Sequence, residues 1–468
     1  MARSHYETIV IGLGAAGVTA ATTLAKAGRV VLGIEAQGRV GGRVNTVLFG
    51  NGVVEVGAEW IHGESSNRVY DVALQIKIPM GLQSAELNVF RSDGQLPNKE
   101  FQAIVNEILA KGMDLMEDVP HKSEPFGHYA VRKLREYIQE NHPELLNDED
   151  LIDQLIELFE LFSNNHSASN NWNDLDSRDR YTPVDGHQYI SWHKHGFKTF
   201  FEVMLNTYNN GPGLPTLDIK LDTEVIQIYW PEHPNEKVTV TTKDGSVVTA
   251  DNVIITVSLG VLKESYKTLF SPRLPASKVT AIENMSIGVM DKIIISFQHS
   301  WWPKNVTFFG FLWRGEDRRK IGREDYWITR IYGATTPMGS NNALTLWTSG
   351  EVAKMVELLP EDLVKRKCVQ LLQMFMGGNI TIPEPTGIIR STWYSNPYTR
   401  GSYSYDSIYS ATLTGLRADL AAPLTDNSGK PRVLFAGEAT DDTHFSTVHG
   451  ACDTGHREAM RLLPGSKI

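Results

Sequence analysis

Three glycines close to the start of the chain have the spacing of a phosphate-binding turn. Gly12, Gly14 and Gly17 form the pattern G-x-G-x-x-G in the segment GLGAAG. Glycine at these positions tightens the turn and lets backbone N–H groups approach a pyrophosphate at a helix N-terminus. Glu35 ends the next apolar stretch, where a carboxylate can accept hydrogen bonds from ribose hydroxyls. The combination predicts a dinucleotide-binding site.

A second turn rich in glycine and arginine follows directly. The segment EAQGRVGGRVNT begins at Glu35 and contains Arg39, Gly41, Gly42 and Arg43. Guanidinium groups bind phosphate through two hydrogen bonds at once, and the glycine pair permits another close backbone approach. Such a turn suits a cofactor that lies extended along the protein, which favours FAD over NAD.

The residues around these turns predict the elements that must hold them. A strand at Thr8–Ile11, a helix at Gly14–Ala27 and a strand at Val30–Glu35 form a βαβ unit, which opens a doubly wound sheet. From about residue 87 to 210 the chain has the composition of long acidic helices. One of these, Leu151–Phe162, is interrupted by acidic residues, so we expect an amphipathic helix on the protein's own core rather than a membrane span.

The remaining pattern predicts a return to the first sheet, a second sheet, and a closing strand and helix. The expected elements are a helix at Val131–Asn141, strands at Leu217–Ile219, Glu224–Tyr229, Val238–Thr242, Val247–Val257, Lys292–Gln298 and within Trp327–Trp347, a helix at Glu361–Gly377, a strand at Val433–Ala436 and a helix from about Thr447.

These patterns predict an α/β fold in which a Rossmann-type FAD-binding domain is interleaved with an α+β substrate-binding domain, whose sheet is largely antiparallel. The expected FAD-binding parts are residues 1–86, 211–285 and 391–468, and the expected helical and substrate-binding parts are residues 87–210 and 286–390.

Charge and cysteine content restrict the class of protein. The 45 basic and 55 acidic side chains give a formal net charge of -10 without a long basic cluster, which argues against nucleic acid as a partner. The acidity either attracts a polycationic substrate or serves solubility, and on charge alone we favour solubility. Cys368 and Cys452 lie far apart in contexts that match no metal-binding spacing, which favours a reducing compartment. His193 and His195 lack a third ligand, so we expect no metal.

The residues at the two ends of the chain predict where in the cell the protein is found. The first residues lead into a predicted strand within a short distance, so we expect no secretory signal and no membrane anchor. The last residues, Ser466-Lys467-Ile468, differ from the peroxisomal signal Ser-Lys-Leu in one branched apolar residue. Cytoplasmic residence and import by the peroxisomal receptor are therefore the two alternatives.

Five longer segments carry a resemblance to a known family. They are EAQGRVGGR from Glu35, VEVGAEWIHG at Val54–Gly63, ADNVIITVSLGVLK at Ala250–Lys263, WYSNPYTRGSYSY at Trp393–Tyr405 and LFAGEATDDTHFSTVHGACDTGHREA at Leu434–Ala459. Over nearly its whole length the chain resembles the flavin-containing amine oxidases, which include monoamine oxidases, polyamine oxidases and lysine-specific histone demethylases. GSYSY and FSTVHGA look most like the animal polyamine oxidases that act on spermine or acetylated polyamines.

The resemblance implies a set of FAD contacts. It assigns Glu35 to the ribose, Arg43 to the pyrophosphate, Val225 to the adenine and Glu438 to the ribitol-phosphate portion. Thr447 is expected at a helix N-terminus that faces the pyrimidine end of the flavin, where positive charge favours the reduced ring. The full implied set is Gly12, Gly14, Ala15, Ala16, Gly17, Glu35, Ala36, Arg43, Gly57, Ala58, Glu59, Trp60, Val225, Trp393, Gly437, Glu438, Thr447 and Val448.

The resemblance also implies three catalytic residues, two of which have a structural alternative. Lys292 would hold a water near the reactive ring nitrogen, but a lysine at this place can also be an edge-strand charge. His62 would hydrogen-bond the substrate amine or serve only as a core histidine. Tyr403 would form one wall of an aromatic cage around the amine. Glu59 could pair with a protonated substrate nitrogen or lie in a solvated turn, and Thr447 would also contact substrate.

One departure from the monoamine oxidases bears on the cofactor. Ser402 stands where those enzymes attach flavin through cysteine, so we expect FAD to be bound non-covalently. Thr447 replaces the second tyrosine of their cage, which implies a pocket that is more open on one side.

The implied activity is the oxidation of spermine, spermidine or an acetylated form at a secondary amine by oxygen. The products would be an aldehyde, a shorter amine and hydrogen peroxide. Another flavin amine or amino-acid oxidase, a histone demethylase, and a flavin-binding protein without turnover remain alternatives. The amino-acid oxidase would need a buried arginine for the substrate carboxylate.

Overall fold

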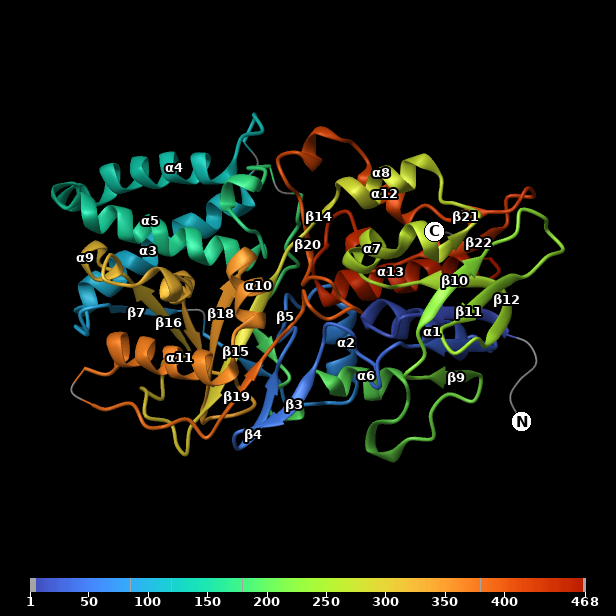
Figure 1. Cartoon of the computed structure of the whole chain (residues 1–468), viewed down its shortest axis with the longest axis horizontal. Coiled ribbons are helices and arrows are strands. Elements are labelled where there is room, and N and C mark those ends of the chain that lie inside the picture. Colours follow the sequence, from blue (N-terminus) through green and yellow to red (C-terminus); the bar gives the residue numbers. More distant parts are fainter. Residues whose placement is uncertain (1–5, 85, 119, 179, 379, 466–468) are drawn as a thin grey trace.

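The computed structural model describes residues 6–465 except 85, 119, 179 and 379. Two bodies, each built on its own sheet, lie side by side, and the chain passes between them several times (Figure 1). One contains α1 (Ala15–Lys26) and α13 (Val448–Arg461), from opposite ends of the chain. These two helices pack together, so the N- and C-terminal segments complete one structural unit.

The first sheet combines a parallel core with an antiparallel extension. Its order is β13 (Phe270–Ser271), β10 (Val225–Tyr229), β11 (Val238–Thr242), β12 (Val247–Ile255), β1 (Tyr6–Ile11), β2 (Val31–Ile34) and β9 (Leu217–Lys220), with β22 (Pro431–Phe435) parallel to β12 and β21 (Leu424–Thr425) beside β22. β1 pairs in parallel with β2 and β12. This confirms the expected βαβ unit and the doubly wound sheet.

Both faces of this sheet are buried, because neighbouring residues of its central strands join different cores. Ile9 and Ile11 face a core formed with α7 (Leu259–Leu269), α8 (Ala276–Asn284) and α12 (Leu416–Ala421). Val10 faces the core of α1 and α13. Burial on both sides explains why these strands are apolar runs rather than alternating ones.

The second sheet contains strands from both segments that the sequence assigns to the substrate-binding part. Its order is β19 (Gly387–Arg390), β15 (Met290–Ser296), β18 (Ala343–Ser349), β17 (Gly333–Thr335), β16 (Phe308–Leu312) and β7 (Leu87–Arg91). All neighbours are antiparallel except β16 and β7. This confirms the expected, largely antiparallel sheet.

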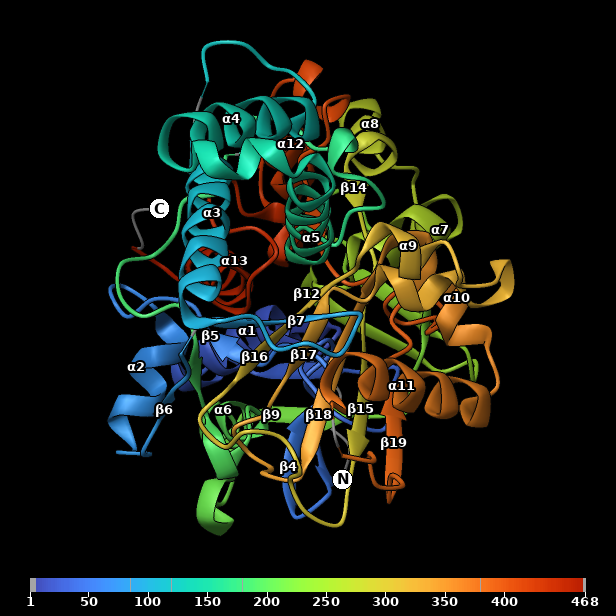
Figure 2. The same ribbon diagram turned by 90° about the vertical axis from the view of Figure 1, so that its left-hand side faces the viewer.

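Helices cover the two faces of the second sheet. One core contains α10 (Gly350–Leu358) and α11 (Glu361–Met376). The other contains α3 (Lys99–Glu117), α4 (Phe126–Asn141) and α5 (Glu149–His166), which stand together in Figure 2. The Asp148 side chain accepts a hydrogen bond from Leu151 N–H and so caps the start of α5.

One expected element differs from the structure. Trp327 lies in a 3-10 helix at Arg323–Arg330, and the strands of this stretch are β17 and β18. Trp327, Ile328 and Thr329 are buried in succession, whereas a strand turns successive side chains to opposite faces. Three adjacent buried residues therefore suit a helical turn better than a strand with one covered face.

Short elements join the two halves. β5 (Trp60–Ile61) and β6 (Gly81–Leu82) pair with β8 (Ile190–Ser191), and β14 (Ser286–Ile287) pairs with β20 (Ser404–Tyr405). β3 (Thr46–Phe49) and β4 (Gly52–Glu55) form a hairpin. α6 (Lys198–Met204) packs with α1 and α2 (Arg68–Gln75), although the expected boundary at residue 210 groups it with the helical block. The domain boundaries stay a prediction.

Among the described helices, none combines the length and apolar character that crossing a bilayer would require.

Candidate active site

One cavity of about 860 Å³ runs from the glycine turn of the first sheet to the aromatic face of the second. It begins at Glu35 and Val225, passes Gly57 and Lys292, and continues to Tyr332. Every residue of the expected FAD and substrate sets lines it except Gly17. The two halves thus share one continuous space.

The glycine turn has the geometry of an anion cradle. Gly12 has a φ of +88°, and a methyl group on Gly17 would lie 1.9 Å from the carbonyl oxygen of Gly12, so this contact between helix and turn requires glycine. Gly14 begins α1 without a side-chain cap, and no acidic residue lies in the first helical turn. Free N–H groups and the positive end of the helix dipole therefore face the cavity.

Glu35 is held beside this turn. Its carboxylate accepts hydrogen bonds from Leu13 N–H at 2.7 Å and from Gln37 N–H at 2.9 Å. The side chain is buried at the end of β2, yet it lines the cavity. A carboxylate fixed next to the cradle fits the ribose of a dinucleotide.

The two arginines of the second turn have different surroundings. The Arg39 guanidinium donates to the carbonyl oxygens of Val40, Gly42 and Val44 and does not line the cavity, so it supports the loop instead of reaching phosphate. Arg43 does line the cavity and donates to Ser402 O at 2.7 Å. The expectation that both guanidiniums serve phosphate is therefore corrected for Arg39.

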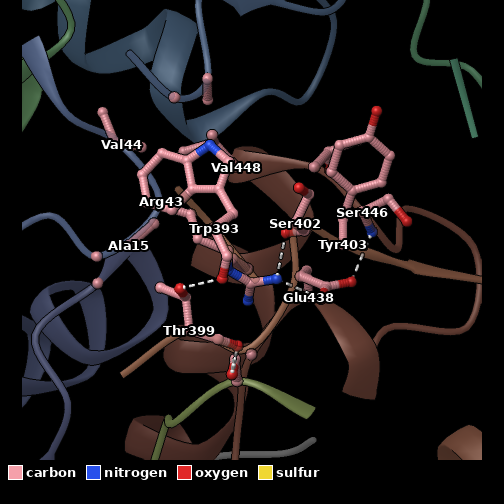
Figure 3. A pocket seen from close by; sticks show the side chains of 18 of the residues that line it. Ala15, Arg43, Val44, Trp393, Thr399, Ser402, Tyr403, Glu438, Ser446 and Val448 are labelled. Carbon is pink, nitrogen blue, oxygen red and sulfur yellow. Dashed lines mark hydrogen bonds and ion pairs between the residues drawn. The ribbon is translucent and has the colours of Figure 1, made fainter. Parts of the chain in front are cut away.

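Arg43 forms a buried network with Glu438 (Figure 3). The two side chains are paired at 2.9 Å, and Glu438 also accepts hydrogen bonds from the Ser404 hydroxyl and Ser446 N–H. Burial opposes ionisation of Glu438, but Arg43 and the Ser404 hydroxyl hold the pKa of this carboxyl below its ordinary value. The cavity wall therefore carries a fixed pair of opposite charges.

The segment from Gly57 and the start of α13 border the middle of the cavity. A methyl group on Gly57 would lie 1.9 Å from Arg43 O and 3.0 Å from the Trp393 ring, which shows how tightly this corner is packed. The Thr447 hydroxyl accepts from Gly450 N–H and caps α13, whose first turn contains no acid. A positive helix end thus faces the cavity at Thr447 and Val448, as expected.

Lys292 is deeply buried between the two halves. β15 lies between β18 and β19, which excludes the edge-strand alternative. Lys292 is the cross-strand partner of Trp347, and its Nζ lies 4.6 Å from the centre of that indole. The Nζ donates to Glu59 Oε2 at 2.7 Å and to Glu55 O at 3.0 Å. Burial raises the pKa of Glu55 to about 7, although hydrogen bonds to its carboxylate oppose the shift.

The sequence suggested that Glu59 either binds a substrate nitrogen or lies in a solvated turn. In the structure its carboxylate is bound to Lys292 through Oε2. The side chain is buried and paired in this way, so it is not a solvated turn residue, and its pairing with a substrate nitrogen stays a prediction. A buried lysine requires a counter-charge, and the spacing along the chain gives no sign that Glu59 supplies it.

His62 and Tyr403 reach the substrate side of the cavity. Gln188 O accepts a hydrogen bond from His62 Nδ1 at 2.7 Å, which leaves Nε2 as an acceptor, and burial lowers the pKa of the imidazole. The Tyr403 hydroxyl donates to Asn165 O at 2.8 Å and to His166 O at 3.2 Å. Burial raises the pKa of this phenol, so it stays neutral.

Sequence reasoning missed most of the aromatic lining. Trp60 stacks on Trp347 at 5.7 Å, and Tyr189 meets Trp60 and Phe308 edge to face at 5.4 and 5.5 Å. These rings come from β5, β16, β18 and the segment before β8, so only tertiary structure brings them together. His449 also lines the cavity. It lies within the segment FSTVHGA, and this motif was the one sign in the sequence that His449 belongs to the site.

The cavity is suited to a flavin held without a covalent bond. Both cysteines belong to the described part of the chain, and neither lines the cavity, so no thiol is available to the ring. The glycine cradle, Glu35, the Arg43–Glu438 pair and the start of α13 all line this one cavity, which suits an extended dinucleotide.

Comparisons with known proteins agree with this geometry. The family model for flavin-containing amine oxidoreductases matches residues 15–463. The human peroxisomal N(1)-acetyl-spermine/spermidine oxidase is 30% identical, and the match covers 98% of this chain and 94% of that protein. A rice lysine-specific histone demethylase 1 homolog 2 is 27% identical over 98% of this chain but only 57% of its own length.

A solved structure has the same fold. It is a putrescine oxidase double mutant with redesigned cofactor binding, which matches with a TM-score of 0.67 and 18% identity over 97% of this chain and 98% of its own. The α/β architecture with an FAD-binding half is thereby confirmed. Family and cleft together identify the cofactor as FAD, and the chain belongs to the flavin-containing amine oxidoreductases.

Proposed function

We propose that the protein is a polyamine oxidase, which oxidises spermine, spermidine or an acetylated form at a secondary amine. The observation that carries the proposal is the junction at Lys292, where the FAD cleft opens into a cavity lined by aromatic rings and neutral imidazoles. The similarity to the human enzyme named for acetyl-spermine and spermidine supports the same substrate class.

Held by the glycine turn, Glu35, Arg43 and Glu438, FAD would supply an acceptor for a hydride equivalent from the carbon beside the amine nitrogen and a route for the electrons to oxygen, with hydrogen peroxide as the product. The resulting imine is hydrolysed by water to an aldehyde and a shorter amine.

The protein's own residues bind and orient the amine. The Tyr403 ring is fixed because its hydroxyl is anchored to the end of α5, and the ring face can align an amine through its quadrupole. His62 Nε2 can accept a hydrogen bond from the substrate nitrogen or hold its proton, since Nδ1 is already committed to Gln188 O. Thr447 would contact substrate from the start of α13.

Lys292 supplies charge at the junction. Its ammonium is fixed by Glu59 and Glu55 O beside the Trp347 ring, and a fixed cation there can support the transfer of electrons to oxygen. The Lys292–Glu59 pair is the candidate for this role, since a lone buried lysine would tend to lose its proton.

The cavity lining argues against an amino-acid oxidase. Among the described residues that line it, each lysine or arginine already has a carboxylate partner: Arg43 with Glu438, Lys243 with Glu224, Lys292 with Glu59 and Arg400 with Glu264. A substrate carboxylate would have to displace one of these. A polyamine meets no such competition.

The direct experiment measures peroxide release by the purified yellow protein with spermine, spermidine, their acetylated forms, monoamines and amino acids. We expect rapid turnover of at least one polyamine and little with amino acids. A flavoprotein inert to every amine would contradict the proposal and favour a flavin-binding protein without turnover.

The location of the protein is also a proposal. The tripeptide Ser466-Lys467-Ile468 lies outside the described residues, and the related human enzyme is named as peroxisomal. We propose import through the peroxisomal receptor, with cytoplasmic residence as the alternative. Imaging a fluorescent N-terminal fusion with and without these three residues would separate the two.

A further inference from the structure

His166, the last residue of α5, projects into the substrate end of the cavity. It lines the cavity, and its side chain is accessible there although protein surrounds it. The ring stacks on Phe162 with 6.1 Å between ring centres. No hydrogen bond to the ring occurs within the described part of the chain, so this imidazole is free to bind a ligand.

The His166 ring is neutral at physiological pH. Burial lowers its pKa to about 4, and the nearby His62 contributes to the shift. A neutral imidazole presents one lone pair, as His62 Nε2 also does. Two neutral acceptors therefore face the same space.

The surroundings of His166 favour a cation. The Asn165 side chain donates to Leu161 O at 2.9 Å, which fixes the amide orientation and leaves Oδ1 without a partner inside the wall. The C-terminal end of an 18-residue helix adds its negative dipole end at the same place. The four lysines and arginines that line the cavity are each paired with a carboxylate outside α5, so their charges are already balanced there.

The end of α5 also lies next to the place proposed for the reacting nitrogen. The Tyr403 hydroxyl donates to the carbonyl oxygens of Asn165 and His166, so one tyrosine side chain separates the Tyr403 backbone from the helix end. A nitrogen one polymethylene spacer from the reacting amine can thus reach His166 while the reacting amine lies against the Tyr403 ring.

We propose that His166 is a specificity-determining residue, whose ring accepts a hydrogen bond from a second, protonated nitrogen of the substrate. This inference rests on the proposed amine oxidation and sharpens it. The enzyme selects amines with a further ammonium group at this position, and a secondary amine without that charge binds more weakly.

The test compares His166→Phe, which keeps a ring against Phe162 but removes the acceptor, with His166→Gln, which retains an acceptor. His299→Phe is the matched control, because His299 is exposed and does not line the cavity. Spermine and dibutylamine are mixed anaerobically with each holoenzyme, and bleaching of the flavin gives a Kd and a limiting rate. If dibutylamine is not oxidised, its inhibition constant against spermine replaces the Kd.

In His166→Phe we expect the Kd for spermine to rise about tenfold or more relative to that for dibutylamine, since hydrogen bonds from charged donors have this strength. His166→Gln should recover most of the loss, and His299→Phe should match the wild type. Equal weakening of both amines, or a glutamine variant as poor as the phenylalanine variant, overturns the inference while amine oxidation stands. No bleaching by any amine in the wild type overturns both.

Discussion

The FAD half and the substrate half of the cavity are built in different ways. The FAD half uses backbone atoms of two short turns and charges that are already paired, such as Arg43 with Glu438. The substrate half uses side chains from β5, β16, β18, α5 and α13, most of them aromatic or neutral imidazoles. A site made of backbone tolerates little change within a short segment, whereas a site made of dispersed side chains can change its selectivity while the fold remains.

Methyl groups added to the glycine turn should have the largest effect on the FAD half. Gly17→Ala places a methyl 1.9 Å from Gly12 O, so we expect a loss of at least about 3 kcal/mol in stability and little folded protein. Expression yield and the urea midpoint measure this.

Gly14→Ala is the matched control, because its methyl would meet no atom closer than 3.9 Å. This variant should fold but bind FAD at least about tenfold more weakly, because the methyl occupies the space in which backbone N–H groups approach phosphate. Flavin content per chain after purification reports it. Normal flavin content in Gly14→Ala would contradict the backbone cradle.

The next largest effect concerns the pair that joins the halves. Lys292→Met leaves the Glu59 carboxylate buried without a partner, so we expect a loss of about 3–5 kcal/mol in the free energy of unfolding and slow reoxidation of reduced flavin. The double variant Lys292→Met/Glu59→Gln should recover most of the stability but not the reoxidation rate. Denaturant unfolding measures the stability, and oxygen-jump kinetics measure the reoxidation rate. If the double variant recovered both, Lys292 would have no role in reoxidation.

The substrate half also contains a buried histidine, His449, that makes stability depend on pH. Burial and the neighbouring His62 and His444 lower the pKa of His449 from 6.5 to about 3. The unfolded chain takes up this proton below pH 6.5 while the folded protein does not, so stability is full above pH 6.5 and declines towards pH 3. At pH 5 the buried His449 alone accounts for about 2 kcal/mol.

His449→Gln should therefore lose about 2 kcal/mol less than the wild type between pH 7.5 and pH 5, as measured by urea unfolding. His299→Gln, at an exposed site, should behave as the wild type does. Identical pH dependence in all three proteins would show that His449 titrates normally.

The smallest expected effect lies at the mouth of the cavity. Glu117 is exposed at the end of α3 and lines the cavity, so it can attract a polycation without binding it tightly. Glu117→Gln should lower kcat/KM for spermine by about twofold to fivefold at low salt and less at high salt. Glu100→Gln, at the other end of the same helix, should leave kcat/KM unchanged. Equal losses of kcat/KM in the two variants would show that only the net charge of the protein matters, not the position of Glu117.

The contrast between the halves also explains what the sequence could predict. The β1–α1–β2 unit is local, and its glycines and Glu35 lie within a short segment, so its position and chemistry follow from spacing. Lys292 was expected from the resemblance alone, but its partner Glu59 lies 233 residues away, and no local pattern links them.

Tertiary packing decided the rest of the site. Tyr189, Phe308 and Tyr332 come from segments with ordinary core patterns, and only the packing of the second sheet against β5 brings them to one cavity. Arg39 stands in the same turn as Arg43, and the direction of each guanidinium depends on which carbonyl groups the folded loop leaves in reach. The spacing of residues along the chain does not predict these directions.

We propose that an amine bound between Tyr403 and His62 reduces the flavin at the Lys292 junction. Anaerobic mixing of the purified holoenzyme with spermine, followed through the visible flavin absorbance, measures this reduction. We predict saturable bleaching, and peroxide release when oxygen is admitted. Flavin that stays oxidised with spermine, spermidine and their acetylated forms would contradict the account.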